Sequence, residues 1–270
     1  MKKILLATTV LAMSAGVAAA DISWGASARA GLASDAGGDI ETYSSANLAV
    51  TLSGTSDSGL TFGATFDMTT GRTYDFGDGD GFGANDGAMG MPTIFIEGSF
   101  GKLAISDDNY DFYDDTNSGG DVEYTGTFGA VSVGLIADVD TNEASAKVGY
   151  TAGALAINAN MDTYDLWNLD ATYTMGSIAI TAATDESENS SLKVAYSAGA
   201  ITASAQYNTS DESIDLSAGY SANGLSVNAS TNSESNAWEV TGSYDLGGGL
   251  SVEAGTNFTE DMYVGASMSF

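Results

Sequence analysis

Apolar residues alternate with small or polar ones along most of the chain, in runs of about nine residues between Asp21 and Phe270. In residues 60–68 (LTFGATFDM), for example, nearly every second residue is large and apolar. Successive side chains of a β-strand point to opposite faces, so each run forms a strand with one apolar and one polar face. Strands of this length, tilted, match the thickness of a bilayer.

The polar faces distinguish a membrane barrel from a water-soluble sandwich. They are built from Ser, Thr, Asn, Gly and Asp, whereas a sandwich exposes Lys, Glu and Arg. Charged residues make up 16% of the chain, below the roughly one quarter of soluble domains. After Ala20 no segment has the ~18 apolar residues of a membrane helix. Strands that cross lipid must close into a barrel, because unpaired backbone groups are costly there.

The links between the runs alternate in length and composition. Short links rich in Gly, Ser and Ala suit tight periplasmic turns, and longer acidic links suit outward loops. We expect such loops at 34–45, 69–91 and 108–120. Counting the runs gives about 18 strands, and barrels of this size enclose an aqueous channel. The predicted fold is all-β: a transmembrane antiparallel up-and-down β-barrel of 16 to 18 strands.

Both ends of the chain indicate export to an outer membrane. Met1-Lys2-Lys3, an apolar run and Ala18-Ala19-Ala20 predict a cleaved secretory signal peptide at 1–20. The remaining residues, 21–270, are expected to form a single transmembrane barrel domain. The last strand is apolar at every second position up to Phe270, which resembles the signal read by the barrel assembly machinery.

The charge balance excludes several functions. Loss of Lys2 and Lys3 leaves five basic and 36 acidic residues, a formal charge of −31. That excludes nucleic acid, which binds through Lys and Arg, and favours cations. The chain has no His and no Cys, so the commonest general base and any disulfide are lacking. We therefore expect no enzymatic activity.

Three stretches resemble the Rhodobacter-type porins of alphaproteobacteria: Ser23–Gly71, Ile94–Asn109 (IFIEGSFGKLAISDDN) and Tyr124–Asp138 (YTGTFGAVSVGLIAD). The resemblance implies homotrimers of 16-stranded barrels in the Gram-negative outer membrane, embedded in lipid, with passive diffusion and a pore constricted by an inward third loop. Two features depart from this pattern. The segment Asp108–Gly120 is shorter than the usual constriction loop, and the strand count exceeds 16.

The resemblance and the alternation together indicate candidate site residues. The acids of the constriction loop and its exit strand would be Asp107, Asp108, Asp111, Asp114, Asp115, Asp121 and Glu123. The basic pore wall would consist of Arg29, Lys147 and Lys193, whose neighbours on each side are apolar. The acids Asp75, Asp78, Asp80 and Asp86 among glycines could hold a structural Ca²⁺, although they lack the final Glu of an EF-hand. No other cofactor is expected.

The function predicted from these features is that of a general diffusion porin that passes small hydrophilic solutes and prefers cations. One alternative is a substrate-specific channel of the sugar type. It would need aromatic residues along the lumen, whereas the large aromatics fall mainly on the outward face, apart from Phe95. Another alternative is a structural or adhesive barrel that does not conduct, although no segment is long enough to be an obvious plug.

Overall fold

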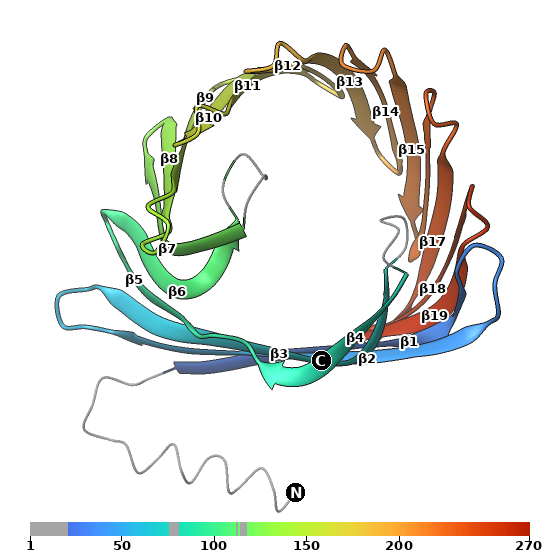
Figure 1. Ribbon diagram of the computed structural model, residues 1–270, viewed down its shortest axis with the longest axis horizontal. Coiled ribbons are helices and arrows are strands. Elements are labelled where there is room, and N and C mark those ends of the chain that lie inside the picture. The colour runs from blue at the N-terminus through green and yellow to red at the C-terminus, as the bar shows by residue number, and fades with distance from the viewer. Residues whose placement is uncertain (1–20, 76–80, 112, 114–117) are drawn as a thin grey trace, which may run out of the picture.

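The computed structural model describes residues 21–75, 81–111, 113 and 118–270, and the regular elements in these ranges are all β-strands. They form one antiparallel sheet that closes on itself (Figure 1), because β1 (Asp21–Ser34) pairs with both β2 (Glu41–Thr55) and β19 (Met262–Ser269). The described ranges hold no helix that is long and apolar enough to span a membrane. The other strands are β3 (Thr61–Asp75), β4 (Gly81–Met89), β5 (Thr93–Gly98), β6 (Gly101–Asp111), β7 (Ser118–Phe128), β8 (Val131–Ala137), β9 (Ala144–Ala152), β10 (Leu155–Asp162), β11 (Trp167–Met175), β12 (Ile178–Asp185), β13 (Ser190–Ala198), β14 (Ile201–Asn208), β15 (Ile214–Ala222), β16 (Leu225–Asn232), β17 (Trp238–Gly247) and β18 (Leu250–Asn257).

Strands β4 and β5 pair with successive parts of the same edge of β3, so together they add one strand to the count of the barrel. β3 pairs with β5 over Thr61–Thr65 and with β4 from Met68 to Asp75. The wall is therefore a closed barrel of 18 antiparallel strands. This confirms the predicted fold class and the count from the alternating runs, rather than the 16 strands that the resemblance implied.

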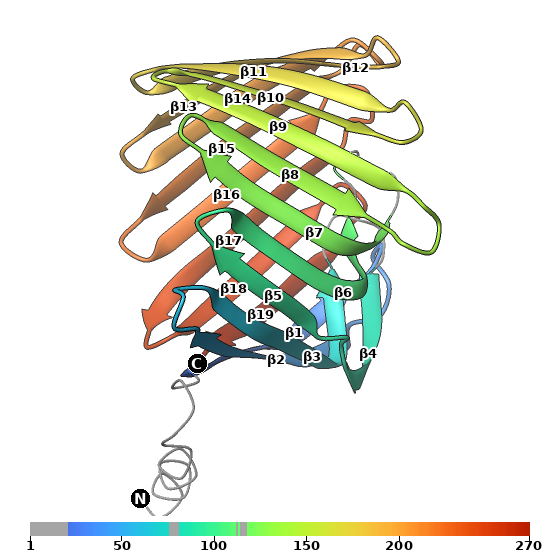
Figure 2. The same ribbon diagram turned by 90° about the vertical axis from the view of Figure 1, so that its left-hand side faces the viewer.

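Tight turns and both ends of the described chain lie at the same end of the barrel. Met175 pairs with Ile178 across a two-residue link in which Gly176 has a φ of 59°, a left-handed conformation that suits glycine in such hairpins. The start of β1 and the end of β19 lie at this end too (Figure 2), since Ser27 pairs with Ser269. The longer links lie at the opposite end, as the alternation of link lengths predicted.

The strands extend further into the outward links than the sequence indicated. The predicted loop at 69–91 is largely the paired strands β3 and β4, and the link at 34–45 shrinks to residues 35–40. Likewise, β6 continues to Asp111 and β7 begins at Ser118, within the predicted loop at 108–120. The reason is that a ladder of backbone hydrogen bonds does not require apolar side chains, so polar Gly-rich segments continue the sheet.

The outer face of the barrel is a band of exposed apolar side chains. Trp24 is 68% exposed and Phe62 46% exposed, as residues that face lipid are when lipid is not present. A soluble monomer rarely exposes so large an apolar surface. Exposed members from other strands include Leu48, Ile94, Leu103, Leu135, Val148, Leu169, Ile178, Val194, Ile201, Leu216, Val227, Val240, Val252 and Val264.

The two faces of a central strand should tolerate charge very differently. Val194 lies at the middle of β13 and points outward, whereas Ala195 pairs with Ser204 on the inner face. We expect Val194→Arg to lower the free energy of unfolding by about 2–4 kcal/mol, because it places a cation in hydrocarbon. Ala195→Arg, the matched control in the wet lumen, should change it much less. Denaturant titration in bilayers measures both, and equal effects would contradict this assignment of faces.

Candidate functional site

The candidate site is the lumen, whose wall is formed by the inward side chains of all strands. On one side, cross-strand pairing places Lys102 opposite Glu97 and Thr125, and Lys147 opposite Gly134. These residues line a hollow of about 590 Å³ together with Glu123 and Tyr113. The side chain of Lys102 lies 4.9 Å from the centroid of the Phe95 ring. This wall therefore alternates acidic and basic side chains.

Tyr113 attaches the link between β6 and β7 to the inner wall. Its backbone N–H donates to Ser145 Oγ at 3.2 Å, and its carbonyl accepts from the side-chain amide of Asn160. The Lys147 ammonium lies 5.7 Å from the centroid of its ring. Its hydroxyl lies over Gly134, where a Cβ atom would come within 2.1 Å of it. The polypeptide thus turns into the barrel here, as Figure 1 shows at the inner end of β6.

The predicted acids of this segment have different surroundings. Asp107 is exposed on β6, and Glu123 lines the hollow between Lys102 and Lys147. Asp121 is 8% exposed, and its Oδ2 accepts from the Val139 N–H at 2.9 Å, so it also supports the β8–β9 link. Outside the described residues lie Asp114 and Asp115, together with the side chains of Asp108 and Asp111.

The predicted basic residues all line the inside of the barrel. Arg29 forms an ion pair with Glu253, with 2.7 Å between Nη2 and Oε1, and its guanidinium lies 5.9 Å from the centroid of the Tyr43 ring. Lys147 is on the wall that holds Tyr113, and Lys193 is on the wall of β13–β18. The fold places these three basic residues in different parts of the lumen rather than in one cluster. Lys102 was missed, although outward Leu103 beside it signals its inward direction.

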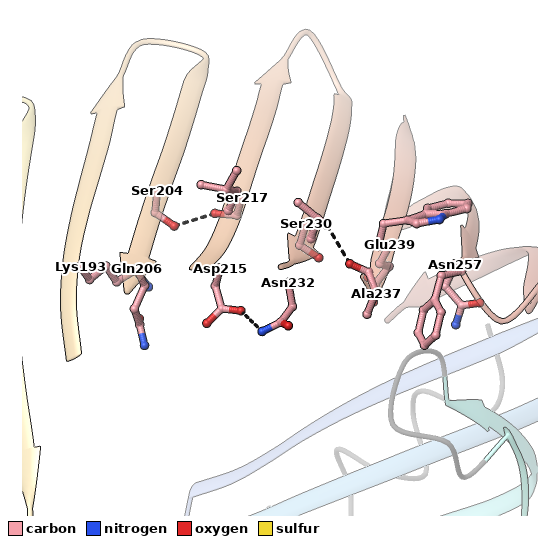
Figure 3. Close-up of a pocket in the computed structure, with 14 residues that line it drawn as sticks. Lys193, Ser204, Gln206, Asp215, Ser217, Ser230, Asn232, Ala237, Glu239 and Asn257 are labelled. Carbon is pink, nitrogen blue, oxygen red and sulfur yellow. Dashed lines mark hydrogen bonds between the residues drawn. The ribbon is translucent and has the colours of Figure 1, made fainter. Parts of the chain in front are cut away.

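The wall of β13–β18 carries Asp215, whose partners are neutral amides (Figure 3). The two carboxylate oxygens of Asp215 accept from Asn208 Nδ2 at 2.7 Å and from Asn232 Nδ2 at 2.6 Å. Higher up the same wall, Ser204 and Ser217 share a hydrogen bond of 2.7 Å. This wall encloses a hollow of about 390 Å³ that also contains Lys193 and Glu239. The amides orient the carboxylate of Asp215 without neutralising its charge.

A cluster of aromatic rings inside the barrel was not predicted. Tyr43 and Tyr74 are 2% and 3% exposed, and Phe82 and Tyr263 pack against them. Phe95 faces inward as expected, beside Lys102, but it is not the sole inward exception among the large aromatics of the described residues. The signal that could have located these rings is glycine on neighbouring strands. A Cβ atom at Gly265 would lie 2.1 Å from the Tyr43 hydroxyl.

The predicted calcium ligands lie mostly outside the described structure. Asp78 and Asp80 are not described, nor are the side chains of Asp75 and Asp86. In the part of the chain that is described, no group of three or more acidic side chains is close enough to hold a metal ion. The Ca²⁺ site stays a prediction.

Comparison with known proteins identifies the family. A family model described as Gram-negative porin matches residues 7–268, nearly the whole chain. The chain belongs to the Gram-negative porin family. The porin fold and this family place it in the outer membrane as a multi-pass β-barrel, and they point to a channel rather than an enzyme.

Solved structures share the fold of this porin at low identity. A mutant of the Rhodopseudomonas blastica porin matches with a TM-score of 0.57 at 17% identity, over 93% of this chain and 100% of that chain. A triple mutant of the same porin has a TM-score of 0.56, with the same identity and coverage. A porin refined at 1.8 Å gives 0.54 at 18% identity, over 93% of this chain and 100% of that one. The resemblance to alphaproteobacterial porins is thus confirmed. Comparison with curated proteins gave no match.

The contact between Tyr113 and Gly134 predicts a substitution that narrows the pore. Gly134→Val should push the Tyr113 ring off the wall and toward the axis, because no Cβ atom fits beneath its hydroxyl. Single-channel conductance should fall. In a Tyr113→Ala background the same substitution should have little further effect, since the ring is no longer there. An equal fall in both backgrounds would show that Gly134 acts independently of Tyr113.

Asp138 predicts how the β8–β9 link at the pore mouth responds to pH. Its carboxylate accepts from Thr141 Oγ1 at 2.7 Å and from the backbone N–H of Thr141 and Asp140, and these bonds lower its pKa. A lowered pKa stabilises the fold above the ordinary Asp value of about 3.9, and this contribution is lost as pH falls through the folded value. Hydrogen-exchange protection of these amides should therefore fall in acid. Asp138→Ala should remove this protection at neutral pH as well, because the acceptor carboxylate is gone. Protection that persists in the alanine variant would contradict this assignment.

Proposed function

We propose that this porin is a general diffusion channel that passes small hydrophilic solutes and ions passively and prefers cations. The family and the closed barrel support the first part. The second part rests on the inner wall, where Asp170 and Asp215 are held by amides rather than by basic residues.

The pairing of charges in the lumen favours cations. The ion pairs among the described residues are Arg29–Glu253 and Arg72–Glu41. Asp215 is held by two asparagines, and Asp170 Oδ2 accepts from Asn158 Nδ2 at 3.1 Å. An amide carries no net charge, so it leaves the negative charge of the carboxylate uncompensated. The field of these groups attracts cations into the pore.

We assign the constriction to the segment that Tyr113 attaches to the wall. Its acids and Glu123 would face the lumen, and Arg29, Lys147 and Lys193 would supply the basic wall. Support comes from the attachment of Tyr113 to the inner wall and from the lumen positions of the three basic residues. Salt screens charges in a wet pore, so this arrangement should select by charge most strongly at low ionic strength.

We further propose that the barrel acts as a homotrimer in the outer-membrane lipid and is assembled through its C-terminal strand. The family and the exposed apolar band support the membrane and oligomer assignments. Phe270 is 73% exposed, and its N–H donates to the Ala26 carbonyl at 2.8 Å, so it lies at the seam that closes the barrel. The signal peptide predicted at 1–20 falls outside the described residues.

Reversal potentials across a KCl gradient in a planar bilayer test the proposal. The potential should have the sign of a cation-selective pore. It should be larger near 0.01 M than near 1 M salt, because the Debye length falls from about 30 Å to about 3 Å. An anion-selective potential at low salt would refute the cation preference. A folded barrel without conductance would refute the channel itself.

A pair of matched double variants separates the lumen charges from the total charge. Asp170→Asn with Asp215→Asn removes two charges from the inner wall, and Glu212→Gln with Glu234→Gln removes two from the outward links. The first variant should reduce cation selectivity clearly more than the second. Equal reductions would mean that the overall charge of the protein, rather than these carboxylates, sets the preference.

A further inference from the structure

The hairpin formed by the end of β3 and by β4 leaves the barrel wall. β5 is paired on both edges: Ile94 lies opposite Ala64 of β3 and opposite Ile105 of β6. In the described pairings, β4 is paired with β3 alone. The change occurs at residues 90–92, where Pro92 has no N–H to donate to a neighbouring strand. The Pro92 carbonyl instead accepts from Ser106 Oγ at 3.3 Å. In Figure 1, β4 begins inside the ring of strands, across the lumen from the inner end of β6, and runs back to the wall.

Tyr74 fixes this hairpin to the inner wall. The ring is 3% exposed, and its centroid lies 6.0 Å from that of Tyr43 and 6.2 Å from that of Tyr263. Its hydroxyl donates to the Ser34 carbonyl at 3.4 Å. Phe82 on β4, the cross-strand partner of Tyr74, packs against the same ring with 4.9 Å between centroids. Ser34 of β1, Tyr43 of β2 and Tyr263 of β19 thus hold the end of the β3–β4 hairpin against the inner wall.

Two further contacts hold the hairpin at the end of the barrel where the longer links lie. Arg72 Nη1 is 2.5 Å from Glu41 Oε2, and its guanidinium lies 3.9 Å from the centroid of the Phe82 ring. A Cβ atom at Gly81 would lie 2.8 Å from Asp35 Cγ. The Arg72 side chain is still 41% exposed, so the hairpin brings a cationic group to the mouth of the pore.

We propose that the β3–β4 hairpin is a second constriction element, which narrows the pore from the side opposite the segment held by Tyr113. Tyr74 is its positioning residue, and the Arg72–Glu41 ion pair fastens its base. The inference rests on the proposed function as a diffusion channel. It also accounts for the shortness of the β6–β7 link, because two elements together narrow a lumen that one short link would leave wide.

A cross-link tests the position of the hairpin independently of conductance. The chain has no cysteine, so Asp35→Cys with Gly81→Cys introduces a single pair. The Cβ atoms would lie no more than about 4.3 Å apart, within the range of a disulfide. Oxidation of the folded barrel should form the bond in most molecules. A second pair, Glu41→Cys with Arg72→Cys, joined by a short bifunctional thiol reagent, avoids the left-handed backbone of Gly81. Failure of both pairs to cross-link would overturn the proposal.

Conductance tests what the hairpin does. Tyr74→Ala should raise single-channel conductance, whereas Tyr74→Phe, which keeps the ring, should stay near the parent. Phe82→Ala removes a ring from β4 itself and serves where Tyr74→Ala does not fold. Adding the cross-link to Tyr74→Ala should restore the parent conductance. Equal conductance for the alanine and phenylalanine variants would overturn the constriction role. A parent barrel that cross-links but does not conduct would instead refute the proposed function, and with it this role.

Discussion

Hydrocarbon offers no partner to a backbone N–H or C=O group, and this constraint explains most features of the barrel. Each strand must be paired on both edges, so the sheet closes between β1 and β19, and Phe270 continues the pairing to Ala26. The same constraint leaves the side chains free to vary, provided that the outer ones are apolar. In the described structure, β4 departs from this rule of pairing on both edges: it leaves the cylinder and is paired along one edge. That place lies at the end of the barrel near water, where unpaired groups can be solvated.

Aromatic rings over glycines take the place of a conventional core. Tyr43 lies over Gly31 and Gly265, and Tyr113 lies over Gly134. A glycine in a strand has no side chain to pack and leaves its backbone exposed. An aromatic ring from a neighbouring segment can cover that backbone. Tyr113 attaches the β6–β7 link to the wall. Tyr43 is part of the wall surface on which Tyr74 of the β3–β4 hairpin packs. The pore shape therefore depends on a few glycines that have no side chain of their own.

The alternation of residues predicted the fold because a membrane barrel repeats one simple unit. Strand number and tight turns such as Gly176 follow from local sequence alone. The positions of Lys102, Lys147 and Lys193 follow as well, since each has an outward neighbour. Alternation also places Tyr43 and Tyr263 inward, opposite the outward faces of Leu48 and Val264, but it could not place Tyr74. Alternation from Phe62 onward would point Tyr74 outward, but Gly71, with a φ of 98°, and the register shift beside it interrupt the pattern.

The roles of charged residues depend on which partners the register brings to them. Arg29 and Glu253 are 224 residues apart in sequence and meet only because β1 and β18 flank β19. Their pairing removes one of the few lumen cations from the balance of free charge. Asp215, in contrast, lies between two asparagines that compensate its lost hydration but not its charge. A pore wall that holds carboxylates with amides and pairs its arginines with glutamates keeps negative charge uncompensated in the lumen. In the proposed channel it is this distribution, more than the total charge, that would favour cations.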